Sequence, residues 1–157
     1  MKLVREGLST PKLTDLMDVR PVLNSDTDAV VVLWLVVFPE YSDLTRPQRD
    51  PRSNVVRKLA FGDGLFWLAE VDGRVVGTVM AGYDGHRGWV YSLGVHPEAR
   101  RLGVGRALLI EAERALVKLG CPKVNLQVLS SNAGALAFWR SVGYAQDDVV
   151  SLGKRLG

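Results

Sequence analysis

The feature that most constrains the fold is a hairpin signal in the middle of the chain. Leu65–Val71 and Arg74–Ala81 are largely apolar, and Asp72-Gly73 joins them. An Asp-Gly pair favours the positive-φ backbone of a two-residue turn, so the two segments are expected to pair as antiparallel strands. A further turn signal, Asp84-Gly85, precedes a third strand-like segment, Trp89–Val95. The chain is therefore expected to fold around three consecutive antiparallel strands.

A helix is expected after the third of these strands. Pro97 ends the strand, and Gly120 and Pro122 are typical of a helix end. Between these positions apolar residues recur at steps of three or four, as on one buried face of a helix, namely at Val104, Leu108, Ala112, Ala115 and Leu119. The sequence therefore predicts a helix over 104–119.

The segments before the hairpin predict one strand and two helices. Met17–Leu23 is typical of a strand, and residues 24–28 (NSDTD) are typical of a helix start, because short polar side chains cap helices and acids favour their positive end. The apolar segment that follows, Ala29–Phe38, is rich in valine and would also suit a buried strand, but we favour a helix. Two prolines place Arg46–Arg52 in a loop, and Asn54–Ala60 is expected to be a short helix.

The last third of the chain predicts two more strands and one more helix. Val124–Leu129 and Asp148–Leu152 have strand-like composition, and Ala133–Val142 is expected to be a helix that ends at Gly143. The expected fold is α/β, with a single mixed, mostly antiparallel sheet flanked by helices. Because no repeat or low-complexity linker divides the sequence, one domain is expected over 17–157, preceded by an N-terminal extension over 1–16.

Composition excludes several classes of protein. The chain has 157 residues, 47% of them apolar, and a formal charge of +3, which suits a globular domain with its own core. A single cysteine, Cys121, excludes a disulfide scaffold and favours a reducing, cytoplasmic location. The longest apolar run, Ala29–Phe38, is too short to cross a bilayer, and Met1–Leu16 lacks the continuous apolar region of a secretory signal. Basic and aromatic residues do not interleave as in nucleic-acid-binding proteins, so nucleic acid is a minor alternative.

Arg100–Gly105 (RRLGVG) has the properties of an anion cradle. Its two glycines allow close approach of a ligand to the backbone, and the first amides of the following helix have no partner within the helix. A dinucleotide-binding G-x-G-x-x-G would need glycine in place of Leu108, and the Gly-Lys-Ser/Thr of a P-loop is absent from the sequence. By itself the motif is weak evidence. Two interpretations are open: a phosphate site, or a glycine-rich helix start with solvated arginines.

Two longer motifs resemble the GCN5-related N-acetyltransferase (GNAT) superfamily. Residues 95–109 (VHPEARRLGVGRALL) resemble its acetyl-CoA motif, V-x-P-x-x-R-x-x-G-x-G-x-x-L-L. Residues 132–144 (NAGALAFWRSVGY) resemble its later motif, N-x-x-A-x-x-F-Y-x-x-x-G-F. Two further segments, R-P-x-x-D-P over 46–51 and GYDGHRG over 82–88, resemble a little-characterised bacterial branch of the superfamily. The resemblance implies the GNAT fold, whose central strands splay apart.

The resemblance assigns the acetyl-CoA site residue by residue. It implies that the backbone amides of Arg101–Arg106 hold the pyrophosphate, in agreement with the anion cradle. It also implies that pantetheine pairs with the backbone near Leu93 and Val95, on a strand with a bulge. Gly94 is compatible with such a bulge. Asn132 matches a residue that binds the cofactor arm and is also a candidate helix cap. The implied cofactor-binding residues are Leu93, Gly94, Val95, Arg100, Arg101, Leu102, Gly103, Val104, Gly105, Arg106, Asn132 and Phe138.

Acetyl transfer to an amine needs a hydrogen-bond donor for the oxyanion and a base for the amine. By resemblance, the backbone N–H of Leu93 is the candidate donor. A lysine-like amine has an ordinary pKa of about 10.4 and must lose a proton before it attacks. Many members of the family place a glutamate where Trp89 and Tyr91 stand, so a base is missing from that position. The candidate bases are His86, His96, Asp84 and Tyr91, although a lone histidine in a turn is more often just a surface residue.

Trp139 stands where the family usually has the tyrosine that protonates the leaving thiolate. An indole group cannot act as that acid, and a general acid contributes about 10²- to 10⁴-fold. A thiol with a pKa of about 8.5 nevertheless leaves as thiolate near pH 7 at a cost of roughly 2 kcal/mol. Tyr144 replaces the usual phenylalanine of the motif and is a candidate substitute, although the corresponding family position is normally in the core.

The acceptor site is expected in the variable loop around the two prolines. Arg46 and Asp50 in this loop, together with Asp84, are the candidate acceptor-binding residues, because an aspartate would attract a cationic amine. The alternative is that the loop is merely solvated and that Asp50 caps a turn. The tryptophans are expected in the core rather than in the walls of an acceptor site, namely Trp34, Trp67 and Trp89.

Two functions are consistent with these residues. The first is an enzyme that transfers the acetyl group of acetyl-CoA directly to a primary amine of a small molecule or a protein. The second is an acyl-CoA-binding sensor with little turnover, which Trp139 and the missing carboxylate base would favour. Acetyl-CoA is the expected co-substrate in the first case, without a metal. Neither nucleic acid nor a membrane is an expected partner, and a homodimer is a common arrangement in the family.

Overall fold

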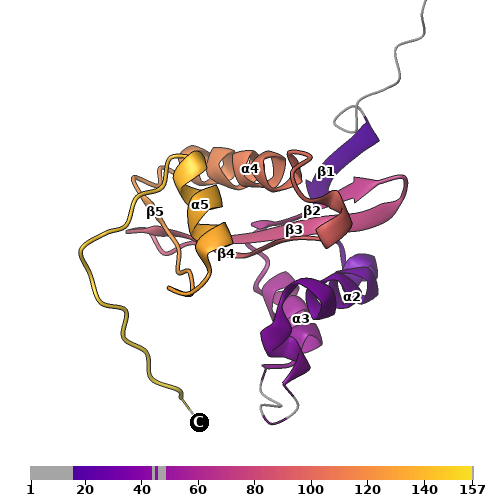
Figure 1. Ribbon diagram of the computed structural model, residues 1–157, viewed down its shortest axis with the longest axis horizontal. Helices are drawn as coiled ribbons and strands as arrows, with labels where there is room; N and C mark the ends of the chain where they lie inside the picture. The colour runs from indigo at the N-terminus through magenta and orange to yellow at the C-terminus, as the bar shows by residue number, and fades with distance from the viewer. Residues whose placement is uncertain (1–15, 44, 46–48, 157) are drawn as a thin grey trace, which may run out of the picture. The chain divides into compact units, whose positions relative to one another are not determined.

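The computed structural model describes residues 16–43, 45 and 49–156, and the chain divides into two compact parts that meet between Leu126 and Gln127. The first part contains a five-stranded sheet and the helices that cover it, and the second contains one helix (Figure 1). Except for Leu16, the predicted N-terminal extension lies outside the described residues. Within the described chain, no helix is both long and apolar enough to cross a bilayer.

The sheet confirms the predicted fold class. Its strands follow one another in chain order, with antiparallel pairing throughout except between the last two, which are parallel. They are β1 (Met17–Pro21), β2 (Phe66–Val71), β3 (Arg74–Tyr83), β4 (Gly88–Val95) and β5 (Val124–Asn125). The predicted hairpin is present, with Asp72 at φ 51° and Gly73 at φ 72°. Positive φ at both turn residues is the geometry that an Asp-Gly pair favours.

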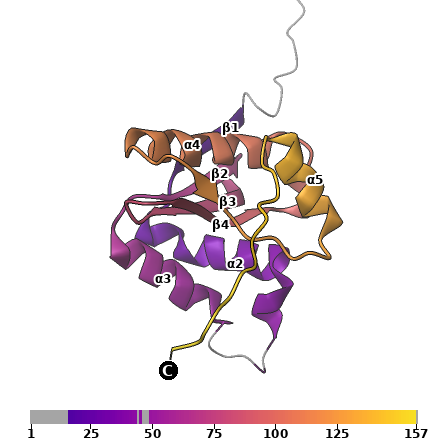
Figure 2. The same cartoon turned by 90° about the vertical axis from the view of Figure 1, so that its left-hand side faces the viewer.

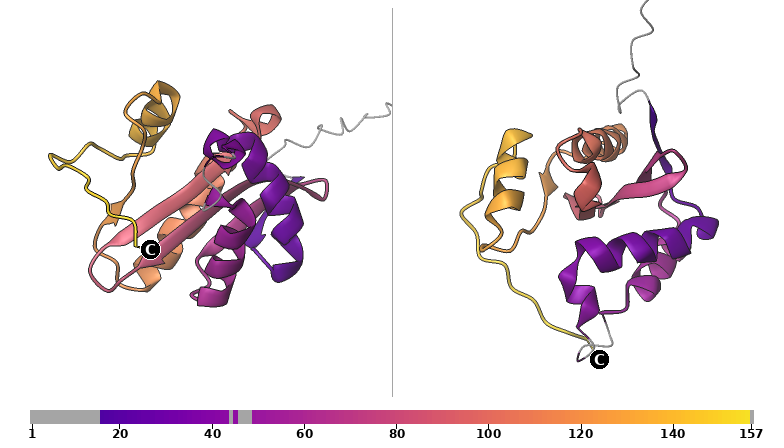
Figure 3. Two further views of the ribbon diagram at one scale, coloured as in Figure 1. Left: turned by 90° about the horizontal axis from the view of Figure 1, so that it is seen from below. Right: turned by 45° about the vertical axis from the view of Figure 1, so that its right-hand side comes forward.

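Helices cover both faces of the sheet in the first part. The helices α2 (Thr27–Val37) and α3 (Pro51–Phe61) lie on one face, and α4 (Val104–Lys118) lies on the other (Figures 1 and 2). The pair α2 and α3 is seen side by side in Figure 3. Short 3₁₀ turns lie beside these elements at η1 (Asn24–Asp26), η2 (Pro39–Ser42) and η4 (Pro97–Ala99).

The apolar segment is helical up to Val37, as predicted from the polar residues 24–28 that precede it. Val30, Leu33 and Trp34 are buried and share one face of α2, because they are spaced by three and four residues. The predicted loop over 46–52 is too long by two residues, since α3 begins at Pro51. Proline suits the first helical position, and the Asp50 side chain caps the backbone N–H groups of Arg52 and Ser53.

The buried face of α4 differs from the predicted stripe at its C-terminal end. Val104, Leu108 and Ala112 are buried as predicted, but Leu116 is the next buried residue and Leu119 is 53% exposed. The helix ends at Lys118, and Gly120 at φ 81° lets the chain turn back. The amide of Cys121 then donates to the Leu116 carbonyl.

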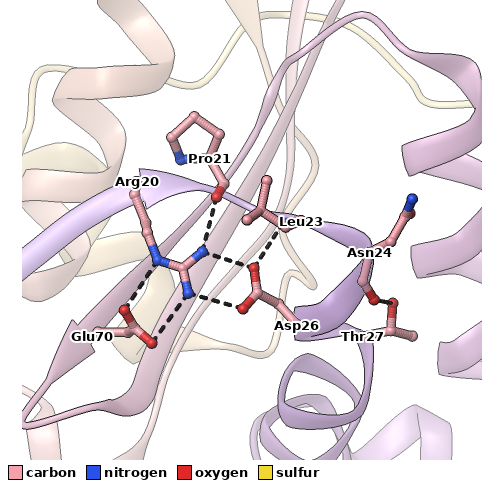
Figure 4. Close-up of polar contacts among 7 residues, drawn as sticks. All are labelled: Arg20, Pro21, Leu23, Asn24, Asp26, Thr27 and Glu70. Atoms are coloured by element: carbon pink, nitrogen blue, oxygen red, sulfur yellow. Dashed lines mark hydrogen bonds and ion pairs between the residues drawn. The ribbon is translucent and has the colours of Figure 1, made fainter.

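One charged cluster links the first strand to its neighbours. The guanidinium of Arg20 on β1 donates to both carboxylate oxygens of Asp26, at 2.8 and 2.9 Å, and to both of Glu70 on β2, at 3.1 and 3.2 Å (Figure 4). Asp26 also accepts the backbone N–H of Leu23. The hydrogen bonds from Arg20 are the main cause that lowers the pKa of Asp26. The cluster therefore fixes the turn from β1 into α2.

A bulge interrupts the pairing of β3 with β4. Thr78 pairs with Gly94 and Met80 pairs with Tyr91, so β4 carries one extra residue between these pairs. Ser92, within the extra stretch, has φ 49°. The fully buried Thr78 accepts a hydrogen bond from the Trp34 indole N–H at 2.9 Å and donates to the Ser92 carbonyl at 3.3 Å. Thr78 therefore ties α2 to the bulge.

The C-terminal segments differ in part from the predictions. The predicted strand over 124–129 is a strand only at Val124–Asn125, where β5 pairs with β4. The helix α5 (Ala133–Ser141) is present, with Gly143 after it at φ 96°. The predicted strand over 148–152 is wrong, since this segment pairs with no strand and its apolar side chains are exposed. Strand-like composition by itself supplies no partner for the backbone hydrogen bonds.

Replacing Thr78 with valine tests the hydrogen bond between Trp34 and Thr78 that links α2 to the bulge. Thr78→Val keeps the shape of the side chain but leaves the buried Trp34 indole N–H without an acceptor, which should lower the free energy of unfolding by about 1–3 kcal/mol. Urea denaturation measures the change. In a Trp34→Phe background the same substitution should cost less, because no indole N–H is left unpaired. An equal cost in both backgrounds would contradict the assigned contact.

Candidate functional site

The C-terminal half of β4 has an open edge within the first part of the chain. The strand β5 pairs with β4 only at Gly88↔Val124 and Trp89↔Asn125. From Tyr91 onward, β4 pairs with β3 on one side, and no strand of the part ending at Leu126 pairs with it on the other. Backbone groups on that side are therefore available to an extended ligand.

The hydrogen-bond alternation shows which backbone groups face this edge. The His96 amide donates to the Val76 carbonyl at 2.8 Å, and Val95 lies opposite Gly77. In an antiparallel pair the backbone groups of successive residues point to opposite sides, so those of Val95 point away from β3. The Val95 carbonyl accepts a hydrogen bond from Arg100 Nε at 3.1 Å, in agreement with this direction. Leu93, next to Gly94, lies in the bulged stretch where this regular alternation is interrupted.

Gly94 serves close packing, and the bulge lies at Ser92 instead. A Cβ atom at Gly94 would lie 2.8 Å from Phe38 Cζ and 2.8 Å from Val37 Cγ2. A Cβ atom at these distances would force Phe38 and Val37 to shift, so glycine lets the end of α2 rest directly on β4. On the other sheet face, Gly77 has the same role against α4, where a Cβ atom would lie 2.9 Å from both Val104 and Leu108.

The predicted anion cradle has the backbone geometry that it needs. Arg101 is at φ 62° and Gly103 at φ 84°, just before α4 begins at Val104. The first amide of the helix to bond within it is that of Ala107, which donates to the Gly103 carbonyl at 3.0 Å. Among the residues that the structure describes, no side chain caps the preceding amides at positions 104–106. They point outward at the positive end of a helix of 15 residues, an arrangement that binds anions.

The arginines around the cradle differ in their contacts. Arg100 donates a hydrogen bond to the Val95 carbonyl. Arg101 and Arg106 are exposed, and neither forms an ion pair with the described residues. Leu102 is 44% exposed, so its side chain is not part of the core. The cradle therefore combines free positive charge with outward backbone donors.

A hollow of about 320 Å³ lies on the α2/α3 face of the sheet, beside the bulge. Its apolar wall comes from Trp34, Phe61 and Met80. Polar side chains from α3 and the turn before it complete the lining at Tyr41, Asn54, Arg57 and Lys58, and Ser92 lies on the β4 side. The hollow therefore reaches the bulged residue that precedes Leu93.

Two stacked aromatic rings continue this face of the sheet. The rings of Trp89 and Tyr91 lie 6.3 Å apart with an interplanar angle of 14°. Tyr91 pairs across the sheet with Met80, which lines the hollow, and its side chain is 49% exposed. Partial burial raises the pKa of the Tyr91 hydroxyl, with a smaller contribution from the charge of Asp84. Tyr91 is therefore a neutral hydroxyl at pH 7.

The aspartates predicted to bind the acceptor act in the structure as backbone caps. Asp50 accepts from the Ser53 amide at 2.9 Å and from the Ser53 hydroxyl at 2.5 Å, and these bonds lower its pKa. Asp84 accepts from the amides of His86 and Arg87, both at 2.7 Å, and these bonds lower its pKa. Neither aspartate lines the hollow. The third predicted acceptor residue, Arg46, lies outside the described residues.

The two histidines lie apart. His86 is exposed in the turn between β3 and β4. His96 caps η4 instead, where its Nδ1 accepts the Glu98 amide at 3.3 Å and its Nε2 lies 3.3 Å from Arg74. Within the described residues, no three His, Cys, Asp or Glu side chains gather in a way that could hold a metal ion.

The second part of the chain holds the remaining predicted residues. Asn132 caps α5, accepting the Ala135 amide at 3.0 Å, which confirms the cap interpretation. The Trp139 ring packs edge-on against Phe138 at 5.3 Å and against Tyr144 at 5.0 Å. These three rings therefore form one aromatic cluster around α5.

Sequence reasoning missed the residues of α3 that line the hollow. Asn54, Arg57 and Phe61 recur at steps of three and four, so they share one face of that helix. This spacing was the available signal, but a phenylalanine directly before Gly62 resembles an ordinary helix end. Trp34 is fully buried, as expected of a core residue, and also borders the hollow.

Comparisons with known proteins agree with this geometry. Residues 30–144 match the model of the Acetyltransferase (GNAT) family. Among solved structures, the aminoglycoside N-acetyltransferase AAC(6′)-Iy, in complex with a bisubstrate analogue of CoA and acetylneamine, is similar with a TM-score of 0.71 and 18% identity, covering 89% of this chain and 99% of that one.

Two further similar structures come from named organisms. The PaiA N-acetyltransferase of Thermoplasma acidophilum, in complex with coenzyme A, has a TM-score of 0.75 and 18% identity, covering 85% of this chain and 92% of that one. The ribosomal-protein-S18-alanine N-acetyltransferase of Escherichia coli has a TM-score of 0.67 and 20% identity, covering 81% of this chain and 76% of that one. These likenesses show a shared fold.

Substitution at Gly103 tests the cradle. Gly103→Val places a β-branched residue at φ 84°, which should distort the first turn of α4 and weaken binding of CoA at least about tenfold in calorimetry. Gly120→Val is the matched control, because Gly120 has φ 81° at the other end of the same helix. The control should lose stability but keep its affinity for CoA. Equal affinities in the two variants would show that the pyrophosphate does not bind at the cradle.

Proposed function

Because the chain belongs to the acetyltransferase (GNAT) family, we propose that it transfers the acetyl group of acetyl-CoA directly to a primary amine bound in the same complex. The observation that carries the proposal is the open edge of β4 beside the anion cradle, both within the residues that match the family. The single cysteine supports a cytoplasmic location for this reaction.

The residues at the site suit acetyl-CoA. The amides at positions 104–106 and the charges of Arg101 and Arg106 would hold the pyrophosphate. The backbone groups of Leu93 and Val95 would pair with the amides of pantetheine along the open edge. Because the Val95 carbonyl already accepts from Arg100, a pantetheine donor would share this oxygen or displace the guanidinium.

The chemistry requires a neutral amine and a donor to the thioester oxygen. The amine nitrogen lone pair attacks the carbonyl carbon, a C–N bond forms, and the carbonyl oxygen becomes negative. The N–H of Leu93 would donate to that oxygen. The C–S bond then breaks, the electron pair leaves with the CoA thiolate, and the proton from the amine passes to a base or to water.

The proton acceptor is drawn from the polar groups near the bulge. Tyr91 faces the side of the sheet that carries the hollow, but its raised pKa keeps it protonated at pH 7, so it would donate or relay rather than act as a base. Asp84 has a lowered pKa and remains ionised, and His86 follows it in the same turn. A water chain from the hollow to Asp84 or His86 would carry the amine proton to solvent.

The hollow beside Ser92 would hold the acceptor. It reaches the residue next to Leu93, so an amine within it would face the acetyl group at the open edge. The similar structures include an aminoglycoside acetyltransferase and one that acts on alanine of a ribosomal protein, which supports a primary amine of either a small molecule or a protein.

The alternative function is an acyl-CoA-binding sensor. It is favoured by the tryptophan at position 139, by the absence of a carboxylate from β4, and by the neutral state of Tyr91. Both functions require acetyl-CoA to bind. They differ only in turnover.

Free-thiol release from acetyl-CoA across a panel of primary amines, with calorimetry on the same sample, separates the two functions. Acetyl transfer predicts binding of acetyl-CoA together with thiol release that depends on the amine. Binding without release from any amine would favour the sensor. A protein that binds no acetyl-CoA would contradict both.

Replacing Trp139 with tyrosine tests whether the missing acid limits turnover. Trp139→Tyr restores the usual family residue and is expected to raise kcat about tenfold or more, since a general acid contributes about 10²- to 10⁴-fold. Trp139→Phe is the control without a hydroxyl group and should not raise kcat. If Trp139→Tyr leaves kcat unchanged, protonation of the thiolate is not limiting. Loss of activity in Tyr144→Phe would then identify Tyr144 as the acid.

A further inference from the structure

We propose that the amine acceptor carries an anionic group, such as a carboxylate, on an apolar or aromatic body, and that Arg57 binds that group. The inference rests on the proposed acetyl transfer and names the chemical class of its acceptor. It follows from the charges and the shape of the hollow beside the bulge.

The hollow carries positive charge without a compensating carboxylate. None of the described residues that line it is Asp or Glu, while two of them, Arg57 and Lys58, are cationic. The charge of Lys58 is already compensated by an ion pair, because its Nζ lies 2.6 Å from Asp63 Oδ2. It also lies 2.6 Å from the Ala81 carbonyl oxygen. The remaining uncompensated charge of the lining therefore belongs to Arg57.

The Arg57 guanidinium is held in place by one hydrogen bond to the described residues, and its other N–H donors remain available to a ligand. Its Nη2 donates to the Asn54 side-chain oxygen, and no carboxylate of the described chain pairs with it. Asn54 is itself fixed, since its Nδ2 donates to the Tyr41 hydroxyl at 3.2 Å. A guanidinium presents five N–H donors in a planar fork, so Arg57 retains donors for a two-point bond to a carboxylate.

The other wall of the hollow suits an apolar body. The rings of Trp34 and Tyr41 are stacked, with centroids 5.6 Å apart and an interplanar angle of 6°. Phe61 also lines the hollow, and its side chain is 76% exposed, which is unusual for so large an apolar residue. A ligand ring that packs against Phe61, beside the stacked pair, would bury apolar surface that now faces water.

The hollow defines the two ends of the acceptor. Ser92 lies at the end next to the open edge of β4, where the amine must meet the acetyl group, and Arg57 comes from α3. An acceptor would therefore direct its amine toward Ser92 and its anionic group toward Arg57. A polycationic amine would instead bring positive charge to Arg57, while Asp50 and Asp84 lie outside the lining and serve as caps.

Three amines of one shape test the charge requirement. They share an aminomethyl group on a benzene ring, and the para substituent is a carboxylate in 4-(aminomethyl)benzoate, a neutral amide in 4-(aminomethyl)benzamide and a cation in 1,4-bis(aminomethyl)benzene. We expect kcat/KM from thiol release to be about 10- to 100-fold higher for the benzoate than for the benzamide, as for a hydrogen-bonded charge. The dication should be the poorest acceptor.

Variants at Arg57 assign the preference to that residue. Arg57→Ala should reduce the benzoate-to-benzamide ratio of kcat/KM to near one, chiefly through a higher KM for the benzoate. Arg57→Gln, which keeps a polar side chain of similar length, should do the same, and Arg57→Lys should restore part of the ratio. Arg114→Ala is the control, because Arg114 is an exposed arginine of α4 that pairs with Glu111 and lies outside the hollow. It should leave the ratio unchanged.

Each contrary outcome has a separate meaning. Equal kcat/KM for the three amines, or a preference for the dication, would overturn the anionic acceptor and leave acetyl transfer intact. A wild-type preference that Arg57→Ala does not reduce would overturn the role of Arg57. If acetyl-CoA binds but none of the three amines releases thiol, the acetyl transfer proposal fails for this class and the inference fails with it.

Discussion

The hydroxyl of Thr78 lies between the Trp34 indole N–H and the Ser92 carbonyl, and the arrangement of the reaction centre depends on these two bonds. The first bond holds α2 against the sheet, and the second holds a non-glycine residue at φ 49° in the bulge. The bulge also places Ser92 in the wall of the hollow. A single buried hydroxyl thus couples the proposed acetyl site to the acceptor site.

Glycines allow the helices to approach the sheet closely on both faces. Gly94 admits the end of α2, and Gly77 admits the first turns of α4. Because α4 begins at the anion cradle, the contact of its first turns with Gly77 on β3 also holds the cradle close to the sheet. Backbone groups, together with the charges of Arg101 and Arg106, supply the proposed acetyl-CoA contacts, while other side chains line the acceptor hollow. The two sites therefore respond to different substitutions.

Much of the fold and of the anion cradle was predictable from local sequence signals. The turn at Asp72-Gly73 and the cradle before Val104 each depend on residues close in the chain, whose backbone preferences are strong. The family resemblance implied a bulge on this strand, with Gly94 as a compatible position, but the positive φ lies at Ser92 instead. The sequence around Ser92 has no local signal for this angle, and the Ser92 carbonyl accepts a hydrogen bond from Thr78 on another strand. The hollow could not be predicted from local signals either, because it depends on tertiary contacts that bring Arg57 on α3 to the same surface as β4.

An open strand edge is also a hazard, because unpaired N–H and C=O groups offer a template to another chain. The bulge at Ser92 breaks the straight run of such groups, and Arg100 occupies the carbonyl of Val95 with a charged side chain. Both are devices that natural sheets use against edge-to-edge aggregation. The features that prepare this edge for a cofactor therefore also protect newly made protein from self-association until the cofactor binds.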